Sequence, residues 1–341
     1  MNLQKLNNFN NDIVFVDGLW GTGKSILGPI ISGMQGVEKI KAESIYEYVS
    51  WLYSLKKINK DAAIWMMRTY ADSSQYHNRI GREINLRWND DTGLKQVINK
   101  WDYIKRLFGN EGNDFVDEIN SKNLAFSVMS HMLMLCPELL DNSYGTRVKI
   151  IETVRHPLYM ISHFANYLER FEESREFTMA YYYEGVKVPW FMNESEDEFV
   201  KGNKFERAVQ CIVKLYPLLD NEIEKEKNNG LQILDISFEE IVFETKLTLK
   251  KIEFFLGRQH SEKIEIILKK QKLPRITTAQ GNGHKAYGWQ SSNKSELDYY
   301  QDLLKIVSDN CSIHSQENLH STIKWYNNKY PSKLSNFSFN L

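Results

Sequence analysis

A glycine-rich segment of eight residues has the composition of a phosphate-binding loop. It reads GLWGTGKS over residues 18–25 and fits the pattern G-x-x-x-x-G-K-[ST] in full. The glycines allow successive backbone N–H groups to point at one anion, and the start of a following helix adds partial positive charge. The lysine adds a cation, and the serine adds a hydroxyl for a phosphate or a metal ion. We expect a bound phosphate group to be contacted by Trp20, Gly21, Thr22, Gly23, Lys24 and Ser25.

The segments around this loop predict an α/β fold. Residues 13–16 (IVFV) form a short apolar run typical of a buried parallel strand, and residues 25–34 have apolar side chains at helical spacing. Three more apolar runs stand beside helical patterns, as in parallel strand–helix–strand units: 124–131, 148–154 and 231–238. The predicted architecture therefore has three layers, with a central parallel sheet that carries the phosphate loop and with flanking helices.

No shift in composition marks a linker between domains. We therefore expect a single domain over residues 1–341, with helical insertions at about 43–110 and 186–228. The segment from about 292 to 341 is predicted to hold one helix and a polar tail.

The overall composition excludes several classes of protein. The chain has 341 residues, with 43 Lys and Arg against 44 Asp and Glu, and this even balance argues against a nucleic-acid binder. The three cysteines (Cys136, Cys211 and Cys311) show no C-x-x-C spacing, which excludes a disulfide framework or a cysteine zinc site and favours a reducing compartment. The start of the chain does not resemble a targeting segment, and no apolar stretch is long enough for a membrane helix. We expect a cytoplasmic protein, and the composition leaves its oligomeric state open.

Arg155 directly follows the predicted strand 148–154. An arginine at the carboxyl end of a parallel strand lies in the crevice where α/β folds bind ligands. Ser162 comes seven residues later, in the first turns of a helix predicted to begin after Pro157. The guanidinium fork and the hydroxyl could together hold one phosphate group. The residues alone are equally compatible with an arginine paired to a surface carboxylate and a serine on a solvated helix face.

This strand–Arg–His–Pro–helix segment resembles the 3′-phosphate-binding element of the PAPS-dependent sulfotransferases, a family of nucleotide-binding proteins with a phosphate loop. These enzymes transfer a sulfuryl group from 3′-phosphoadenosine 5′-phosphosulfate (PAPS) to a hydroxyl or an amine. Three further segments are similar to family elements in the same order along the chain. Residues 126–133 (FSVMSHML) are similar to the K-T-H-L-P strand end, and residues 233–257 are similar to a strand followed by Y-E-D-L and a helix that ends in F-L-G. Residues 283–289 (GHKAYGW) are similar to the late K-G-x-x-G-x-W loop.

Two features of the chain depart from the family pattern. The family interval from arginine to serine is usually eight, so that His163 stands where the serine is expected and Ser162 is one residue early. The family loop usually reads K-S-G-T-T, whereas here the lysine comes late, as Lys24. The glycine loop by itself is closer to the pattern of kinases or of nucleoside triphosphatases.

The resemblance implies a set of roles for individual residues. Lys24 and the loop amides would hold the 5′-phosphosulfate, Lys24 would stabilise charge on the bridging oxygen, and no metal ion would be required. Arg155 and Ser162 would hold the 3′-phosphate, while His284 and Lys285 would close over the nucleotide. His131 lies 24 residues before Arg155, an interval similar to that between the family's catalytic histidine and its arginine, and would act as the base. The other candidates for the base are Glu152, His156 and His163.

The sequence keeps other functions open beside sulfuryl transfer. A phosphate-loop kinase that acts on a small molecule would use Asp235 to hold a metal ion and Arg155 to clamp a phosphate. A protein with the same fold could also bind a nucleotide without turnover. For a sulfotransferase we expect a carbohydrate acceptor, because the sequence resembles glycan-directed members of the family. Aromatic side chains that could stack on sugar rings, or equally pack in the core, are Trp88, Trp190 and Phe191.

Overall fold

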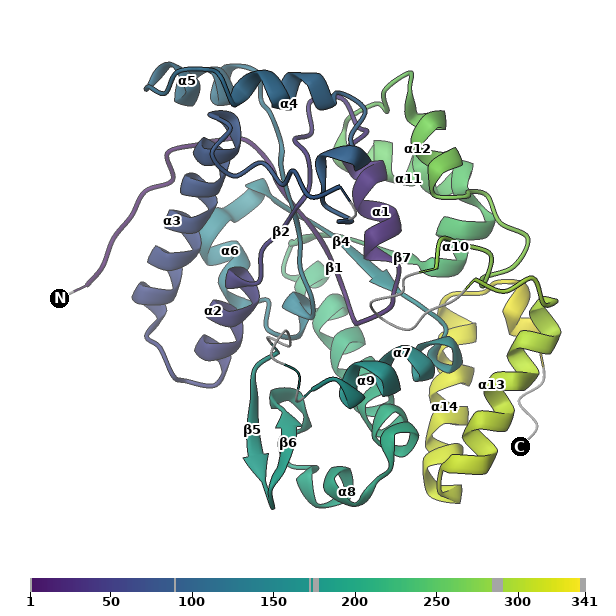
Figure 1. Ribbon diagram of the computed structural model, residues 1–341. Helices are drawn as coiled ribbons and strands as arrows, with labels where there is room; N and C mark the ends of the chain where they lie inside the picture. The colour runs from purple at the N-terminus through teal and green to yellow at the C-terminus, as the bar shows by residue number, and fades with distance from the viewer. Residues whose placement is uncertain (1, 89, 172, 174–177, 284–290, 338–341) are drawn as a thin grey trace.

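A parallel sheet of five strands forms the centre of the molecule, in the order β2-β3-β1-β4-β7 (Figure 1). The computed structural model describes residues 2–88, 90–171, 173, 178–283 and 291–337. The strands are β1 (Ile13–Gly18), β2 (Lys41–Ala42), β3 (Phe126–Met129), β4 (Val148–Val154) and β7 (Gln232–Ser237). The four strands predicted from apolar runs are therefore confirmed, and the short edge strand β2 is an addition.

Side chains alternate between two hydrophobic clusters along β1, as the pleat of a strand requires. Ile13 and Phe15 belong to the larger cluster, whereas Val14 and Val16 belong to the smaller one on the other face of the sheet. All four are fully buried, because helices cover both faces. The architecture is the predicted one: three layers, with the parallel sheet in the middle.

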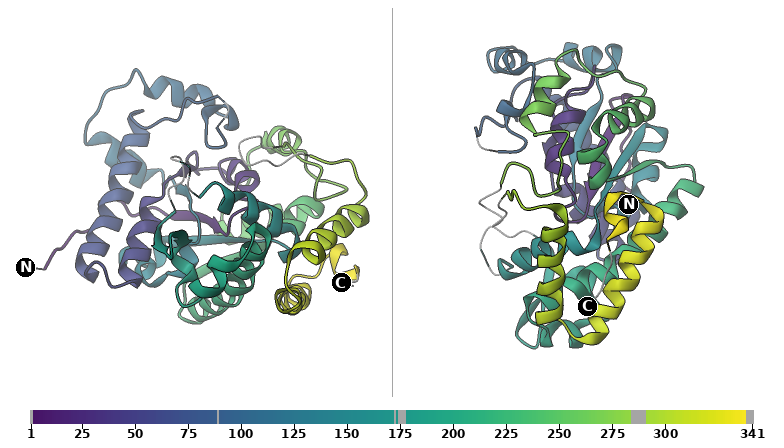
Figure 2. Two further views of the ribbon diagram at one scale, coloured as in Figure 1. Left: turned by 60° about the horizontal axis from the view of Figure 1, so that its bottom comes forward. Right: turned by 90° about the vertical axis from the view of Figure 1, so that its right-hand side faces the viewer.

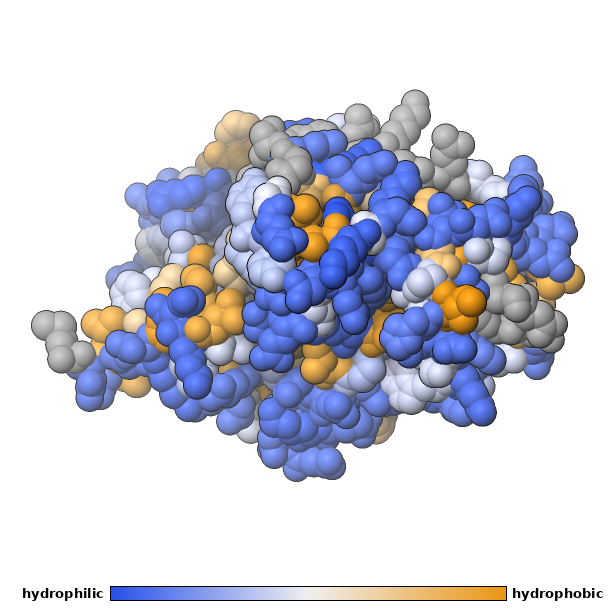
Figure 3. All heavy atoms as spheres, turned by 90° about the horizontal axis from the view of Figure 1, so that it is seen from below, coloured by the Kyte–Doolittle hydropathy of each residue, from blue (hydrophilic) through white to orange (hydrophobic). Residues whose placement is uncertain are grey.

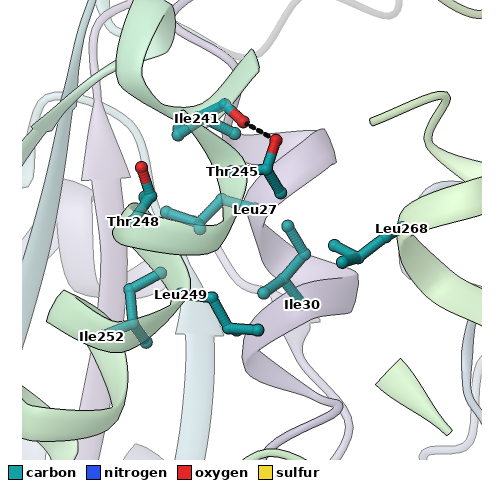
Figure 4. A pocket seen from close by; sticks show the side chains of 8 residues that line it. All are labelled: Leu27, Ile30, Ile241, Thr245, Thr248, Leu249, Ile252 and Leu268. Atoms are coloured by element: carbon teal, nitrogen blue, oxygen red, sulfur yellow. Dashed lines mark hydrogen bonds between the residues drawn. The ribbon is translucent and has the colours of Figure 1, made fainter. Parts of the chain in front are cut away.

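The smaller cluster holds the helix that follows the phosphate loop. This helix, α1 (Lys24–Ile31), packs against α10 (Phe238–Phe243), α11 (Thr245–Leu256) and α12 (Ile264–Lys270) through apolar side chains, including Leu27, Ile241 and Leu249 (Figure 4). Between them remains a small cavity lined by eight side chains, of which only two, Thr245 and Thr248, carry hydroxyls. The hydroxyl of Thr245 already donates to the carbonyl of Ile241 at 2.7 Å. Because the rest of the lining is mostly apolar, we interpret this cavity as a packing gap beside α1.

The larger cluster lies under the helices of the other face and holds most of the buried aromatic residues. These helices are α2 (Ile45–Ser54), α3 (Lys60–Arg79), α6 (Glu138–Tyr144), α7 (Pro157–Glu169) and α9 (Lys204–Asn228). The range 43–110 also holds α4 (Lys100–Arg106), and a further helix, α5 (Asp114–Ser121), lies beyond the predicted end of this insertion. No helix in the described ranges is both long enough and apolar enough to cross a membrane.

The C-terminal segment corrects one prediction. In place of one helix and a polar tail, it forms two helices, α13 (Glu296–Asn310) and α14 (Ile313–Lys329), each of which packs against α7 and α9 (Figure 2). The break between them carries neither glycine nor proline. It comes instead from extended backbone at Cys311 and from Ser312, whose hydroxyl caps α14 by accepting from the N–H of Ser315.

A two-stranded hairpin was also missed. Strands β5 (Ala180–Tyr183) and β6 (Val186–Pro189) pair antiparallel around Glu184 and Gly185, which both have positive φ. The segment from 186, predicted as the start of a helical insertion, therefore begins with a strand, and helix follows only at α8 (Glu196–Lys201) and α9. At the end of the molecule that holds this hairpin, most exposed side chains are hydrophilic and the hydrophobic ones form small separate groups (Figure 3).

Candidate functional site

The phosphate loop connects β1 to α1 in the predicted way. Gly21 and Gly23 have φ of 84° and 102°, a region that side-chain-bearing residues rarely adopt. Each also lies against a ring: a Cβ on Gly21 would stand 2.7 Å from the imidazole of His163, and a Cβ on Gly23 would stand 2.6 Å from the ring of Phe238. Both positions therefore require glycine, and the loop is in direct contact with α7 on one side and α10 on the other.

Lys24 lies inside the loop rather than at its surface. Its ammonium donates to the carbonyls of Gly18 and Leu19, both at 2.6 Å, and the side chain is 5% exposed. Burial lowers the pKa of Lys24 to about 8, although the carboxyls of Asp17, Glu152 and Glu47 act in the opposite direction. The ammonium is thus held where an anion bound to the loop amides would meet it.

Two other loop side chains fasten the loop to its surroundings. The hydroxyl of Thr22 donates to the carbonyl of Leu19 at 2.9 Å and lies 2.7 Å from the hydroxyl of Thr153 on β4. The indole of Trp20 is buried and stacks on Tyr167 with ring centroids 3.8 Å apart. Because the Trp20 side chain is used in packing, contact of this residue with a ligand would involve its backbone. Ser25 is half-buried in the first turn of α1.

Arg155 emerges from the carboxyl end of β4 beside the loop, as predicted. Its Nη1 donates to the carbonyl of Gly21 at 2.9 Å, and its guanidinium lies over the ring of Phe238 at 4.1 Å from the centroid. The side chain is only 3% exposed. Within the described part of the chain it forms no ion pair, and its Nε and Nη2 have no hydrogen-bond partner. A buried guanidinium of this kind is costly unless an anion binds it.

His163, not Ser162, contacts Arg155. The Nε2 of His163 lies 3.1 Å from Nη1 of Arg155, and burial and the neighbouring guanidinium lower the pKa of His163 to about 3. The imidazole is therefore neutral, and its Nε2 accepts a hydrogen bond from the arginine. Ser162 is half-buried on α7, one residue earlier. Arg155 and His163 are thus eight residues apart, the usual spacing between the arginine and the serine in the family that the sequence resembles.

His131 and Glu47 form a second polar pair near Lys24. His131 follows β3, and its backbone N–H donates to Oε1 of Glu47 at 2.6 Å. The same oxygen lies 3.4 Å from Nδ1 of the imidazole. Glu47 is buried on α2, whereas the His131 side chain is 40% exposed. The carboxylate thus orients Nδ1 toward itself, which leaves Nε2 for an external group.

The other candidates for a base are less accessible. His156 is fully buried among the rings of Tyr159, Tyr300 and Tyr326, and burial lowers its pKa to about 3. Glu152 is fully buried, and burial raises its pKa well above the usual value. Of the histidines and carboxyls weighed for this role, His131 is the one with both exposure and an orienting partner.

The remaining predicted residues have various environments. Asp235 pairs with Lys227 at 2.5 Å and accepts from Tyr330, and no group of three or more potential metal-ligating side chains occurs in the described ranges. His284 and Lys285 lie outside the described residues. Of the three aromatic candidates, Trp88 is 61% exposed near Lys95, Trp190 packs on Trp51, and Phe191 is buried against Trp20.

Three residues of this region escaped prediction from the sequence: Glu47, Phe238 and Arg275. Glu47 belongs to an amphipathic helix pattern, and Phe238 ends a predicted strand. Arg275, in the segment LPRITT, belongs to no motif. Their signal is their spatial position alone, because Glu47 meets His131, and Phe238 meets Arg155 and Arg275, only in the folded chain.

Together, fold and site define an α/β protein of phosphate-loop architecture. Its first strand runs through a glycine loop into a helix, a lysine lies within the loop, and a buried arginine stands at the end of the neighbouring parallel strand. Such loops present backbone N–H groups and a helix start to a phosphate-like anion.

Several solved structures are similar to this chain, and they are sulfotransferases. The sulfotransferase domain of the Synechococcus PCC 7002 olefin synthase is 12% identical, with a TM-score of 0.40 over 90% of this chain and 98% of that one. Mouse sulfotransferase SULT7A1, solved in complex with PAP, is 12% identical, with a TM-score of 0.42 over 96% and 88%. The Alicyclobacillus acidocaldarius sulfotransferase is 13% identical, with a TM-score of 0.36 over 94% and 96%. No protein-family model and no curated protein matches the sequence.

Proposed function

We propose that this protein is a sulfotransferase that moves a sulfuryl group from PAPS to a hydroxyl group. The observation that carries the proposal is Arg155, a buried guanidinium with two unpartnered nitrogens directly beside the phosphate loop. A ligand with one anionic group at the loop and a second one at Arg155 would occupy both sites. PAPS has this arrangement, with a phosphosulfate on the 5′ side and a phosphate on the 3′ side of one ribose. In ATP the phosphates form one contiguous chain.

The chemistry follows from the charges that surround the loop. Sulfuryl transfer is an in-line displacement in which an S–O bond to the acceptor forms and the S–O bond to the bridging oxygen of the phosphosulfate breaks. The Lys24 ammonium and the loop amides would stabilise the negative charge that develops on the bridging oxygen. Nε2 of His131 would accept the proton of the acceptor hydroxyl. The products would be the sulfated acceptor and adenosine 3′,5′-bisphosphate.

The acceptor is, in our proposal, a carbohydrate. Next to the His131–Glu47 pair, Trp51 and Trp190 stack with centroids 5.0 Å apart, and the indole N–H of Trp51 donates to the carbonyl of Met132. Trp190 is half-buried and directly follows the hairpin strand β6. An aromatic face beside a base is suited to a sugar ring, which has apolar faces and hydroxyl edges.

Cys136, Cys211 and Cys311 are free and buried thiols, which supports a reducing, cytoplasmic setting.

Ligand-dependent stability tests the nucleotide assignment. We expect adenosine 3′,5′-bisphosphate in the presence of EDTA to raise the melting temperature by about 5 °C at a ligand concentration of about 100 Kd. Radiolabelled sulfate transfer from PAPS to a panel of sugars, phenols and steroids then tests the reaction and the acceptor class. Stabilisation by ATP with magnesium, but not by the bisphosphate, would instead support a phosphate-loop kinase. Binding of the bisphosphate without transfer to any acceptor would indicate a nucleotide-binding protein without turnover.

The Glu47→Gln protein tests the role of the His131–Glu47 pair. Glutamine has almost the same shape but no charge, so the imidazolium that forms during proton transfer loses its counter-charge. We expect kcat to fall about tenfold, against about 10²-fold for His131→Ala, with the KM for PAPS almost unchanged in both. The measurement is kcat and KM of both variants in the sulfate transfer assay. Full activity of His131→Ala would show that another group accepts the proton.

A further inference from the structure

A second buried arginine shares the ring of Phe238 with Arg155. The guanidinium carbon of Arg275 lies 5.8 Å from the centroid of this ring, and that of Arg155 lies 4.1 Å from it. Arg275 is 8% exposed and follows the cis proline Pro274, in the segment after α12. Phe238 also lies against Gly23, so the ring that the two arginines share is in contact with the phosphate loop.

The charge of Arg275 is not balanced by a carboxylate. Its nitrogens donate only to backbone carbonyls among the described residues: to Gln271 at 3.1 Å, Lys272 at 3.3 Å and Thr278 at 3.4 Å. Burial and the positive charge of Arg155 lower the pKa of Arg275 to about 10. Two like charges are thus buried close together without an ion-pair partner, and this arrangement is unfavourable until an anion lies between or beside them.

The carboxyls nearest to this pair have other partners. Glu239 accepts from the hydroxyl of Tyr326 and from the backbone N–H of His156, and burial raises its pKa although the positive charge of Arg155 acts in the opposite direction. Glu296 accepts from the hydroxyl of Tyr159 at 2.7 Å and from both the N–H and the hydroxyl of Thr278 at 2.6 Å. Glu296 therefore ties the segment that bears Arg275 to α7, and so sets the separation of the two arginines without neutralising either one.

We propose that Arg275 is a second anion-binding residue, which acts with Arg155 as a two-arginine site around Phe238 that selects a doubly charged phosphate monoester. Such a group carries close to two negative charges at neutral pH, which matches two guanidinium groups. The inference rests on the proposed function, in which this group is the 3′-phosphate of the nucleotide. It adds a residue on which discrimination between a 3′-phosphate and a 3′-hydroxyl depends.

Calorimetric titration with two nucleotides tests the inference. Adenosine 3′,5′-bisphosphate carries the second phosphate, and adenosine 5′-monophosphate lacks it. We expect Arg275→Met to weaken binding of the bisphosphate about tenfold and to leave binding of the monophosphate almost unchanged. Arg275→Gln, which can still donate to the backbone carbonyls of its segment, should show the same selective loss, and it is the variant to use if the methionine protein does not fold. Arg258→Met is the matched control, because Arg258 also donates to backbone carbonyls, those of Gly36 and Asn123, but pairs with Asp12.

The outcomes separate this inference from the proposed function. Equal losses for the two nucleotides would overturn the inference, because they would show that Arg275 only supports the fold. Unchanged binding of the bisphosphate by both Arg275 variants would also overturn it, while the sulfotransferase proposal would stand. A wild-type protein that binds the bisphosphate no more tightly than the monophosphate would overturn both. A wild-type preference for the bisphosphate that is reduced in the Arg275 variants and unchanged in Arg258→Met would support both.

Discussion

Replacing Lys24 with methionine is expected to reduce sulfuryl transfer by about 10³-fold, since Lys24 is the cation inside the phosphate loop. Methionine fills a similar volume but cannot stabilise charge on the bridging oxygen of the donor. The measurement is kcat in a radiolabelled sulfate transfer assay, with saturating donor and acceptor. The protein should remain folded, because removal of a buried ammonium relieves its desolvation and leaves two loop carbonyls to be satisfied by water.

The pH dependence of binding gives an independent test of Lys24. Its pKa is about 8, below the usual value because the side chain is buried. The ammonium therefore loses its proton as the pH rises through about 8, and the affinity for adenosine 3′,5′-bisphosphate should fall in the same range. The stability of the ligand-free protein should change with pH in the opposite direction to the affinity. Between pH 8 and the unfolded pKa of 10.5 the unfolded chain binds more protons at Lys24 than the folded chain does. This group therefore makes the free energy of unfolding increase with pH.

A Lys24→Arg protein is the control for this experiment, because its guanidinium stays charged and its affinity should not fall above pH 8. Retention of wild-type kcat by Lys24→Met would contradict the assignment of Lys24 to charge stabilisation. A Lys24→Met protein that still loses affinity through pH 8 would show that another group is responsible for the pH dependence.

Replacing Arg155 with methionine is expected to weaken binding of adenosine 3′,5′-bisphosphate by about 10²-fold, through loss of charge-assisted hydrogen bonds. The ligand-free protein should not lose stability, because Arg155 is 3% exposed and two of its nitrogens lack partners in the described part of the chain. Removing such a cation relieves its desolvation cost, and this gain offsets the loss of its hydrogen bonds to Gly21 and His163. Calorimetry gives the dissociation constant, and thermal unfolding without ligand gives the stability.

Arg147→Met is a matched control on the same strand. Arg147 precedes β4 and Arg155 follows it, and both have unpartnered guanidinium nitrogens among the described residues. Arg147, however, lies at the start of β4, the end of the strand away from the phosphate loop, where its Nε donates to the carbonyl of Asn11 at 2.8 Å. We expect Arg147→Met to leave nucleotide affinity unchanged. A fall in stability without a change in affinity for Arg155→Met would show that Arg155 is a structural residue.

The central sheet could be predicted because its signals are local. Each main strand is a continuous apolar run, and the phosphate loop needs its residues in one order within eight positions, between a strand and a helix. The hairpin β5–β6 was missed because each of its strands has only four residues, too few for an alternating pattern to stand out. The break between α13 and α14 was missed because Ser312 can occupy the interior of a helix as well as cap one.

In the candidate site, too, some features follow from local sequence and others follow only from the fold. The sequence by itself determined the phosphate loop, the cation Lys24 within it and the place of Arg155 at a strand end, since consecutive residues and the parallel direction of the strands decide these positions. Only the tertiary structure decided that His163 rather than Ser162 contacts Arg155, that Glu47 orients His131, and that Arg275 shares a ring with Arg155. These contacts depend on the rotation of α7 and on packing between segments about 80 to 120 residues apart, and no periodicity or spacing along the chain specifies either one.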